Sequence, residues 1–258
     1  MNSDSYTLKK SLGQHFLQDE VLCQKIVDQV SLHPGLQLLE VGPGGGAITK
    51  YLLQLPDVEY KAIEIDTEKI AFLKKNYPAI QDKIQEQDIL HAEKPFSGNF
   101  SIIGNFPYNI SSQILFKVLD WKENVDEVIG MFQKEVARRI ANGPGSKEYG
   151  ILSVLMQAFF DVEYLFDVPP EAFNPPPKVM SGVIRLTKNS NPFDIQDVKT
   201  FKRLVKAAFN QRRKTLRNAL RGTLPEAALT ENELMGKRAE QLSVEQFAGL
   251  YHQFMVQS

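Results

Sequence analysis

Residues 36–46 read LQLLEVGPGGG. The first six are mostly apolar, which is typical of a buried strand, and the glycines and proline that follow end it in a turn. Glycine lets a backbone adopt positive φ and approach a bound ligand closely. In open α/β sheets ligands bind beyond the carboxyl ends of the strands. The stretch therefore predicts the first strand and the ligand-binding turn of an α/β fold.

Strand-like and helix-like segments alternate on the carboxyl side of this turn. Apolar residues recur at helical spacing from Ile48 to Leu55, and a second helix is expected from Glu68 to about Asn76. Further strands are expected at residues 59–66, 84–88, 101–104 and 128–132. This alternation predicts a mainly parallel sheet with helices on both faces.

The pattern changes near Val162. Two strand-like runs, 162–168 and 179–186, flank a proline-rich loop and predict a hairpin with a long, stiff connection. Residues 189–192 resemble a linker, and the last part of the chain is helical in pattern. We therefore predict two domains, residues 1–188 and residues 189–258.

Composition limits the class of protein. The chain has 258 residues, of which 43% are hydrophobic and 24% charged, a balance typical of globular proteins. A single cysteine, Cys23, excludes an internal disulfide framework and a Cys-rich zinc site. No signal-peptide pattern and no run long enough to span a bilayer occur in the sequence. We expect a cytoplasmic protein without a membrane partner or a metal.

Positive charge is concentrated in one part of the chain. Nine basic residues and no acidic residue lie between Lys199 and Arg221. Lys199, Lys202, Arg203 and Lys206 share one face of an expected amphipathic helix. Arg213, Arg217 and Arg221 are expected to form a second stripe on a second helix. Such a surface favours binding to a polyanion such as RNA.

Residues 105–108 read NFPY and follow the apolar run 100–104. We expect them at the carboxyl end of a strand. The Asn105 oxygen and the Pro107 carbonyl can each accept one N–H of an exocyclic amine, while the Tyr108 ring stacks on the base. Four residues alone are equally compatible with a proline turn that buries an aromatic ring.

Acidic residues end the next two expected strands. Glu64 can accept hydrogen bonds from ribose hydroxyls, and Asp88 can accept one from an adenine amine. Together with Gly42 they would form a nucleoside-binding shelf. The glycine spacing departs from the dinucleotide fingerprint, and no Walker lysine follows it. S-adenosylmethionine, which is cationic and carries no phosphate, suits an acidic shelf better than a pyrophosphate cofactor does.

Six motifs occur together and in order: LGQHFL (12–17), EVGPG (40–44), IEID (63–66), NFPYN (105–109), FNPPPKV (173–179) and QRRK (211–214). The set closely resembles the small-subunit ribosomal RNA adenine-N6,N6-dimethyltransferase family, from about residue 10 to residue 221. The last two motifs fit this family better than the related enzymes that modify large-subunit rRNA. His15 stands where the family more often has Asn.

The resemblance implies a class I S-adenosylmethionine-dependent methyltransferase fold, which is Rossmann-like with a seven-stranded, mostly parallel sheet, followed by a small C-terminal α-helical domain. It also implies dimethylation of N6 in two adjacent adenines near the 3′ end of small-subunit rRNA during ribosome biogenesis. The expected partner is the immature 30S subunit, and the expected oligomeric state is a monomer.

The expected site residues form three groups. Cofactor contacts implied by the resemblance are His15, Leu17, Gly42, Glu64, Asp88 and Asn105. Catalytic positions are Asn105 and Pro107, which hold the amine, and Tyr108 and Phe173, whose rings sandwich the flipped base. Expected RNA contacts are Lys9, Lys10, Lys178, Lys202, Lys206, Arg212, Arg213, Lys214, Arg217 and Arg221.

Two other functions remain open on the residues alone. A non-catalytic RNA-binding assembly factor would have no use for the NFPY motif and the acidic shelf. A nicotinamide-dependent oxidoreductase fits the glycine turn but leaves the NFPY motif and the basic helices unexplained.

Overall fold

The structure, a computed structural model, describes residues 15–211 and 213–254. Its contacts divide the chain into two units. The first contains the residues up to Ala137 together with Glu163–Lys188, and the second contains Arg138–Val162 together with the chain from Asn189 onward. The division at residue 188 coincides with the expected linker, but residues 138–162 also belong to the second unit. The organisation into two domains, residues 1–188 and 189–258, therefore stays a prediction.

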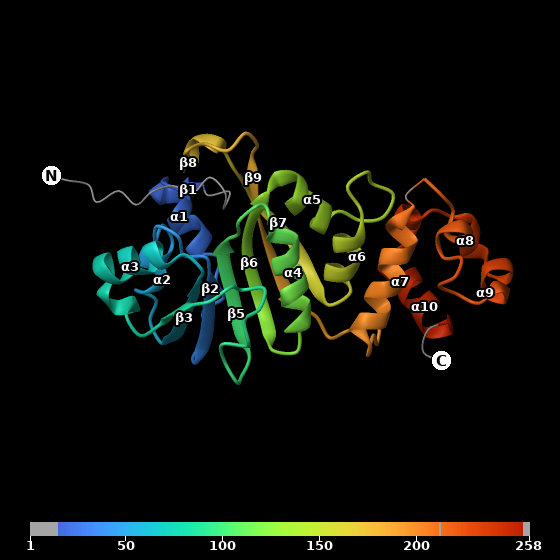
Figure 1. The fold of residues 1–258 in the computed structure, drawn as a ribbon, viewed down its shortest axis with the longest axis horizontal. Helices are drawn as coiled ribbons and strands as arrows, with labels where there is room; N and C mark the ends of the chain where they lie inside the picture. Colours follow the sequence, from blue (N-terminus) through green and yellow to red (C-terminus); the bar gives the residue numbers. More distant parts are fainter. Residues whose placement is uncertain (1–14, 212, 255–258) are drawn as a thin grey trace. The chain divides into compact units, whose positions relative to one another are not determined.

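A seven-stranded sheet forms the first unit (Figure 1). Its strands lie in the order β4 (Ile84–Glu86), β3 (Val58–Glu64), β2 (Leu36–Val41), β5 (Phe100–Asn105), β6 (Val125–Gln133), β9 (Ser181–Lys188) and β7 (Phe160–Val168). The pairs from β4 to β6 are parallel, and β9 runs antiparallel to β6. The predicted mostly parallel, seven-stranded sheet is confirmed.

The register of the sheet brings the predicted motifs to one edge. Val41 of β2 lies opposite Ile63 of β3, and Glu40 of β2 lies opposite Ile103 of β5. Because parallel strands end at the same edge, the glycine turn after β2, Glu64 at the end of β3 and Asn105 at the end of β5 become neighbours.

Helix α1 (Glu20–Val27) precedes β2, whereas α2 (Thr49–Leu52), α3 (Thr67–Asn76), α4 (Ser111–Asp120) and α5 (Lys134–Ala141) follow β2, β3, β5 and β6 respectively. Helix α3 begins at its N-cap Asp66, whose side chain accepts a hydrogen bond from Glu68 N. Helix α2 is a single turn, much shorter than the apolar spacing from Ile48 to Leu55 predicted. Apolar residues of these helices pack on the sheet, as Ile70 and Leu73 of α3 do in the buried core.

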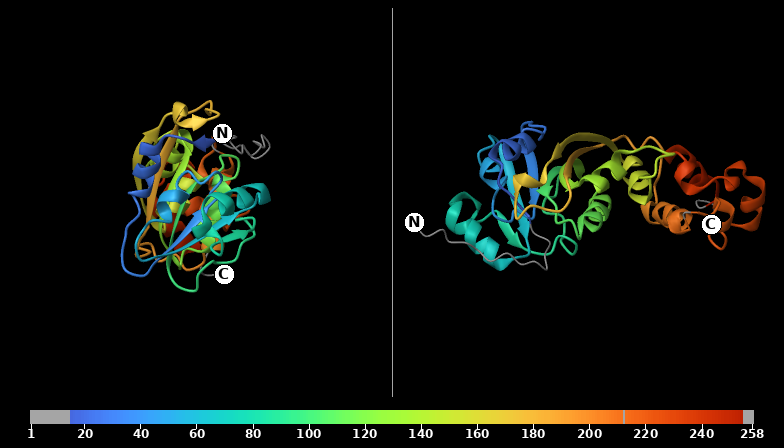
Figure 2. Two further views of the ribbon diagram at one scale, coloured as in Figure 1. Left: turned by 90° about the vertical axis from the view of Figure 1, so that its left-hand side faces the viewer. Right: turned by 90° about the horizontal axis from the view of Figure 1, so that it is seen from above.

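A second, two-stranded sheet brings distant parts of the first unit together. Strand β1 (Phe16–Leu17) pairs antiparallel with β8 (Phe173–Asn174), with Leu17 opposite Phe173. Gln18 N also donates to Ala172 O at 2.7 Å. Both strands lie beside each other in each view of Figures 1 and 2. The proline-rich loop is therefore attached to the segment that precedes α1, a pairing that the sequence pattern did not predict.

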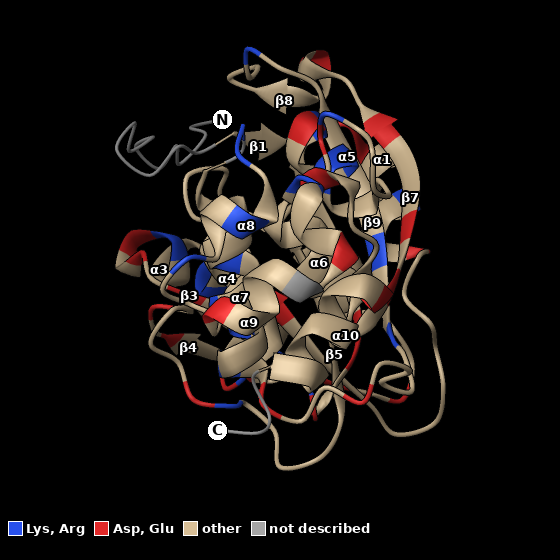
Figure 3. Cartoon of the chain, turned by 90° about the vertical axis from the view of Figure 1, so that its right-hand side faces the viewer, with Lys and Arg blue, Asp and Glu red and all other residues tan. Residues whose placement is uncertain are grey.

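The second unit consists of helices α6 (Ile151–Gln157), α7 (Val198–Asn210), α8 (Leu216–Ala219), α9 (Glu226–Glu231) and α10 (Val244–Phe254). Helix α7 is amphipathic as predicted: Phe201, Leu204 and Val205 are buried, whereas Arg203 and Lys206 are exposed. Figure 3 shows basic segments on α7 and α8.

The predicted second basic helix is wrong in its extent. Helix α8 spans only Leu216–Ala219, so Arg217 lies in it whereas Arg213 and Arg221 lie outside it. Gly222, with a φ of 80°, and Thr223 lead away from this short helix. The three arginines therefore do not form a stripe on one continuous helix.

The described part of the chain contains neither a helix suited to cross a membrane nor a cluster of metal-binding side chains. No helix within residues 15–211 and 213–254 combines the length and the apolar content needed to cross a membrane. Over the same residues, no group of three or more His, Cys, Asp or Glu side chains is placed to hold a metal ion.

Candidate cofactor and adenine site

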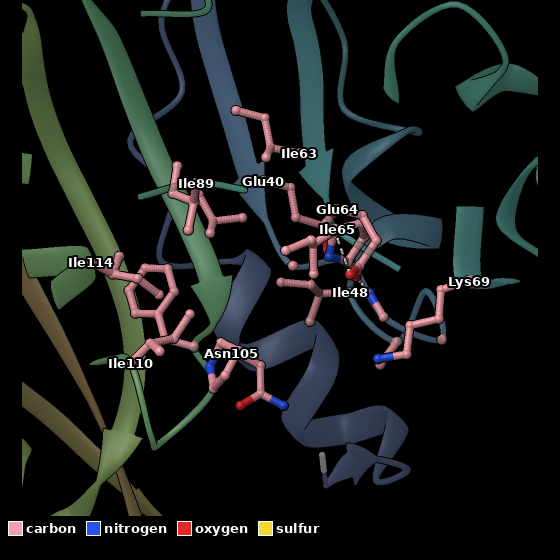
Figure 4. A pocket seen from close by; sticks show the side chains of 18 of the residues that line it. Glu40, Ile48, Ile63, Glu64, Ile65, Lys69, Ile89, Asn105, Ile110 and Ile114 are labelled. Carbon is pink, nitrogen blue, oxygen red and sulfur yellow. Dashed lines mark hydrogen bonds between the residues drawn. The ribbon is translucent and has the colours of Figure 1, made fainter. Parts of the chain in front are cut away.

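A cavity of about 250 Å³ lies at the carboxyl edge of the parallel strands. Figure 4 shows Ile89, Ile110 and Ile114 on one side of it, Glu64 and Lys69 on the other, and Asn105 between them. The structure brings eight of the predicted residues to its lining: His15, Leu17, Gly42, Glu64, Asp88, Asn105, Pro107 and Tyr108.

The glycine turn forms one wall of the cavity. Gly42 has a φ of 68°, a conformation that only glycine adopts readily, and a Cβ there would meet no atom within 4 Å. Open space beside this backbone lets a ligand approach it closely. Gly42 N donates to Ile63 O at 2.9 Å, which ties the turn to the end of β3.

Glu64 holds the turn and the start of α3 in place. One carboxylate oxygen, Oε1, accepts hydrogen bonds from Ile65 N at 2.9 Å and Asp66 N at 3.0 Å. The other, Oε2, accepts from Gly44 N at 3.1 Å. A carboxylate has about four acceptor sites. One site, at Oε2, thus remains for a ligand hydroxyl, fewer than the two ribose contacts that the sequence suggested.

Glu40 lies beneath the same turn and was not predicted as a site residue. It is 1% exposed, and its carboxyl group accepts hydrogen bonds from Thr49 Oγ1 at 3.0 Å and from the Tyr60 hydroxyl. Burial raises the pKa of Glu40 to about 7; the two hydrogen bonds oppose this shift, and the nearby charge of Glu64 adds to it.

Asp88 and its neighbours form the opposite end of the shelf. Asp88 follows β4 and accepts a hydrogen bond from Leu90 N at 2.9 Å, and its second oxygen lies 3.0 Å from His91 Nδ1. Ile89 and Leu90 line the cavity beside it. Apolar side chains next to a carboxylate suit a flat base that also carries an amine.

The NFPY turn is held by its own backbone and by the core. Phe106 is fully buried and packs edge-on against Phe132, with ring centroids 5.1 Å apart. The Pro107 carbonyl accepts a hydrogen bond from Ile110 N at 3.1 Å, and the Tyr108 carbonyl accepts one from Ser111 Oγ at 3.1 Å. Each carbonyl oxygen has two lone pairs, so the Pro107 carbonyl can accept a second bond.

One hydrogen bond orients the Asn105 side chain. Its Nδ2 donates to the His15 carbonyl at 3.3 Å. This bond places the donor half of the amide toward β1 and leaves Oδ1 on the other half as an acceptor. An acceptor at the end of β5 is what the predicted grip on an amine requires.

Tyr108 is held at both ends. Its hydroxyl lies 2.5 Å from Ser181 Oγ, and its ring stacks on the His15 imidazole with centroids 5.7 Å apart and an interplanar angle of 29°. Burial raises the pKa of Tyr108 above its ordinary value. The phenol therefore stays protonated at neutral pH and can serve as a fixed, uncharged platform.

Phe173 lies elsewhere than the base-sandwich prediction requires. It is 4% exposed, belongs to the hydrophobic core together with Leu17, and is not among the residues that line the cavity. Its stacking role stays a prediction, because the ring would have to leave the core to meet a base.

The predicted RNA contacts lie mostly on the surface. Lys178, Lys206, Arg213, Lys214, Arg217 and Arg221 are exposed, and Lys202 is half-buried. The guanidinium Nε of Arg217 donates to Leu229 O at 3.0 Å, so this side chain also joins α8 to α9. Lys9, Lys10 and Arg212 lie outside the described residues.

Sequence reasoning missed three further side chains around the cavity. Glu40 precedes the glycine turn and was predicted only as part of a strand and of the EVGPG motif, without a role of its own. Lys69 is 4% exposed, lines the cavity, and has its ammonium 5.2 Å from the centre of the Phe16 ring. Ser181, which anchors Tyr108, begins β9 and carries no local sequence signal. Only Glu40 could have been suspected, because an acidic residue rarely ends a buried strand without a partner.

Comparison with known proteins identifies the family. The sequence model described as ribosomal RNA adenine dimethylase matches residues 5–255. The chain belongs to the ribosomal RNA adenine dimethylase family. The match includes residues of both units.

Relatives and solved structures agree with this assignment. The dimethylase is 52% identical to ribosomal RNA small subunit methyltransferase A of Cytophaga hutchinsonii, over 94% of this chain and 95% of that protein. It is also 52% identical to the protein of the same name from Bacteroides fragilis, over 95% and 91%. A dimethyladenosine transferase from Plasmodium falciparum superposes with a TM-score of 0.80 at 25% identity, over 93% of this chain and 97% of that one. The 23S rRNA methyltransferase ErmE gives a TM-score of 0.69 at 26% identity, over 92% and 98%.

The residues of the cavity fit S-adenosylmethionine. The open space at Gly42 admits a ligand to the backbone, and Glu64 retains one acceptor site for a hydroxyl. The carboxyl groups of Glu64 and Asp88 line the cavity together with the ammonium of Lys69, and Glu40, whose pKa is raised to about 7, adds a carboxyl group that is only partly ionised at neutral pH. An acidic lining favours a cation such as a sulfonium. These observations support the predicted cofactor.

Proposed function

We propose that this protein transfers methyl groups from S-adenosylmethionine to N6 of adenines in small-subunit ribosomal RNA, and that it dimethylates two adjacent adenines near the 3′ end. Membership of the adenine dimethylase family and the names of the close relatives support the reaction. The single observation in the structure that supports it most is the orientation of the Asn105 amide, whose acceptor half is left for the adenine amine.

Methyl transfer to an adenine amine is difficult because its lone pair is delocalised into the ring. Asn105 Oδ1 and the Pro107 carbonyl can accept the two N–H groups and direct the lone pair toward the cofactor side of the cavity. Tyr108 supplies a ring for stacking, and its position is held by Ser181. This is catalysis by orientation and fixed dipoles, and it needs no strong base.

Glu64, Asp88 and the turn at Gly42 would hold the cofactor, whose sulfonium supplies an electrophilic methyl group when it is bound. Glu64 would accept a ribose hydroxyl and Asp88 the amine of the cofactor's own adenine. The apolar side chains of Ile65 and Leu90 would cover that base and keep water from its faces.

The natural substrate, in our proposal, is the immature 30S subunit in the cytoplasm, where small subunits are assembled, and the enzyme acts as a monomer. Exposed basic residues of α7 and of the segment from Arg213 to Arg221 would contact phosphates. Such contacts carry little sequence information, so the choice of adenine would come from RNA shape and from the base that enters the cavity.

Transfer of labelled methyl groups to immature small subunits, compared with naked rRNA, tests this function. We expect Asn105→Ala to lower kcat at saturating cofactor by about 100-fold or more, because a preorganised acceptor is lost, while particle affinity changes little. Affinity for S-adenosylhomocysteine, measured by calorimetry, shows whether the cofactor site is intact.

A matched control lies at the other end of the same strand. Asn99 precedes β5 and donates to Asp126 at the edge of the sheet away from the cavity. Asn99→Ala should leave kcat unchanged. Near-normal turnover of Asn105→Ala would contradict the amine grip, and cofactor binding by a wild-type protein without methyl transfer would favour the assembly-factor alternative.

A further inference from the structure

We propose that His15 is a positioning residue for the acceptor base: it restrains the Tyr108 ring and joins the proline-rich loop to the NFPY turn. This inference rests on the proposed function, because it specifies how the same site holds its adenine. The sequence resemblance had implied a cofactor contact for His15, so the two assignments lead to different measurable consequences.

His15 makes three contacts with two segments that lie far from it in the sequence. Its Nδ1 lies 2.8 Å from the carbonyl oxygen of Pro175, its ring stacks on Tyr108, and its own carbonyl accepts the amide of Asn105. The proline-rich loop and the NFPY turn are therefore joined through one residue.

The contact with Pro175 determines where the imidazole carries a proton. A carbonyl oxygen can only accept, so Nδ1 must carry the hydrogen and donate it. The ring is thereby held in one orientation, because this bond and the stack on Tyr108 restrain it from two directions. A ring restrained in this way limits the movement of the Tyr108 ring that stacks on it.

Tyr108 depends on that support. Its hydroxyl is tethered to Ser181, which is fully buried, but a single tether leaves the ring free to turn about its long axis. The His15 ring at an interplanar angle of 29° restricts this rotation from one face. The other face of a ring so restrained can receive a flat base in a defined plane.

An asparagine at position 15 would not do this. Asn carries an amide N–H donor at the same δ position as His Nδ1 and can keep the bond to Pro175, but it has no ring to stack on Tyr108. Phe has the reverse properties, since it keeps the ring and loses the donor. His15→Asn and His15→Phe therefore separate the stacking contact from the hydrogen bond.

The experiment compares these two variants with His33→Asn in the full-length protein. His33 is a matched control: its Nδ1 also approaches a proline carbonyl, that of Pro34 at 3.2 Å, but it is exposed and precedes β2 at the opposite edge of the sheet. Three quantities are measured for each protein: kcat and KM with small-subunit particles, Kd for S-adenosylhomocysteine, and the NMR signals of ¹³C-labelled tyrosine rings, with Tyr108 assigned by Tyr108→Phe.

We expect His15→Asn to lower kcat at saturating cofactor by about tenfold or more, because the base is held less firmly, with Kd for S-adenosylhomocysteine within about threefold of wild type. Its Tyr108 ring signals should shift, since the ring current of the imidazole is lost. His15→Phe should retain kcat within about threefold, because the stack that places the base survives. His33→Asn should change none of the three quantities.

Two results would overturn the proposal. One is a His15→Asn protein whose kcat recovers fully at saturating cofactor while its Kd rises, which is the behaviour of a cofactor contact. The other is an unchanged Tyr108 signal in that variant. A wild-type protein that is inactive on small-subunit RNA would instead refute the proposed function, and the Tyr108 signal in the free protein would still decide whether His15 supports the ring.

Discussion

At the residue scale, the two acidic side chains beside the glycine turn have different tasks because their surroundings differ. Glu64 accepts hydrogen bonds from three backbone N–H groups and so connects the glycine turn to the start of α3. Glu40 is buried more deeply and accepts hydrogen bonds from only two hydroxyl groups. The effect of burial on its pKa is therefore the largest one, and the pKa rises to about 7. One acid organises the binding turn, and the other makes the stability of that region depend on pH.

This difference predicts the pH dependence of stability. Between about pH 4.5 and pH 7 the folded protein holds a proton on Glu40 that the unfolded chain has lost. The contribution of the protonated Glu40 to the stability of the folded protein is therefore complete below about pH 4.5, and it is lost as the pH rises through about 7. Relative to Glu40→Gln, the wild-type free energy of unfolding should fall by about 3 kcal/mol over this range.

Urea denaturation of both proteins at a series of pH values measures this difference. Glu59→Gln is the control, because Glu59 lies on the exposed side of β3, where its carboxylate accepts a hydrogen bond from Gln37 and lies 3.9 Å from the Lys61 ammonium. The comparison of wild type with Glu59→Gln should lack the fall of about 3 kcal/mol that is expected for Glu40. A constant difference for Glu40→Gln as well would mean that Glu40 is ionised in the folded protein throughout.

At the element scale, the short β1–β8 pair determines where His15 and Phe173 lie. Two residues from each strand are enough to place His15 beside the NFPY turn and Phe173 in the core. A pair this short is not stable by itself. Its stability must come from Leu17 and Phe173, which lie opposite each other and are both buried.

Phe173 provides a test of this element. Removal of a buried aromatic side chain leaves a cavity, so Phe173→Ala should lower the free energy of unfolding by about 3–5 kcal/mol. Phe173→Leu keeps an apolar side chain of intermediate size and should lose less. Chemical denaturation measures both losses, and a loss below about 1 kcal/mol for Phe173→Ala would mean that the core does not depend on this ring.

The Leu variant also tests the predicted stacking role. A large fall in kcat for a stably folded Phe173→Leu protein would support a ring that leaves the core to stack on the adenine. Unchanged turnover would leave Phe173 with a structural role alone.

At the scale of the whole molecule, charge separates the tasks of the two units. The cavity of the first unit has an acidic lining, which suits a cationic cofactor, and the second unit carries exposed basic residues, which suit phosphates. A change on the basic surface should therefore alter RNA binding without altering cofactor binding.

Arg213→Gln combined with Arg221→Gln tests this separation. Both residues are exposed, and Arg217 is left intact because it also bonds to Leu229. We expect the slope of log affinity against log salt to flatten by about 1–2 units, since up to two phosphate contacts are lost. Filter binding with small-subunit RNA between low and moderate salt measures the slope.

Lys83→Gln combined with Lys94→Gln removes the same charge from a different place. These lysines precede β4 and β5, at the edge of the sheet away from the cavity, and both are exposed. This control should keep the wild-type slope. Equal slopes for all three proteins would show that Arg213 and Arg221 are ordinary solvated side chains and that RNA binds another surface.

The strands, the edge of the sheet and most of the cavity could be predicted from the order of the amino acids. Gly42, Glu64 and Asn105 could be placed together because apolar runs define parallel strands, and the ends of such strands meet at one edge. The ordered motifs also identified the family that the comparisons then showed. All of these features depend on local patterns, which are visible in consecutive residues of the chain.

Contacts between groups that are far apart in the chain became visible only in the folded protein. His15 and Pro175 are separated by 160 positions, and Tyr108 and Ser181 by 73. The burial of Phe173, the environment of Glu40 and the short extent of α8 likewise depend on what packs against them. Such contacts arise from the free energy of the whole core, and no periodicity of a single segment carries that information.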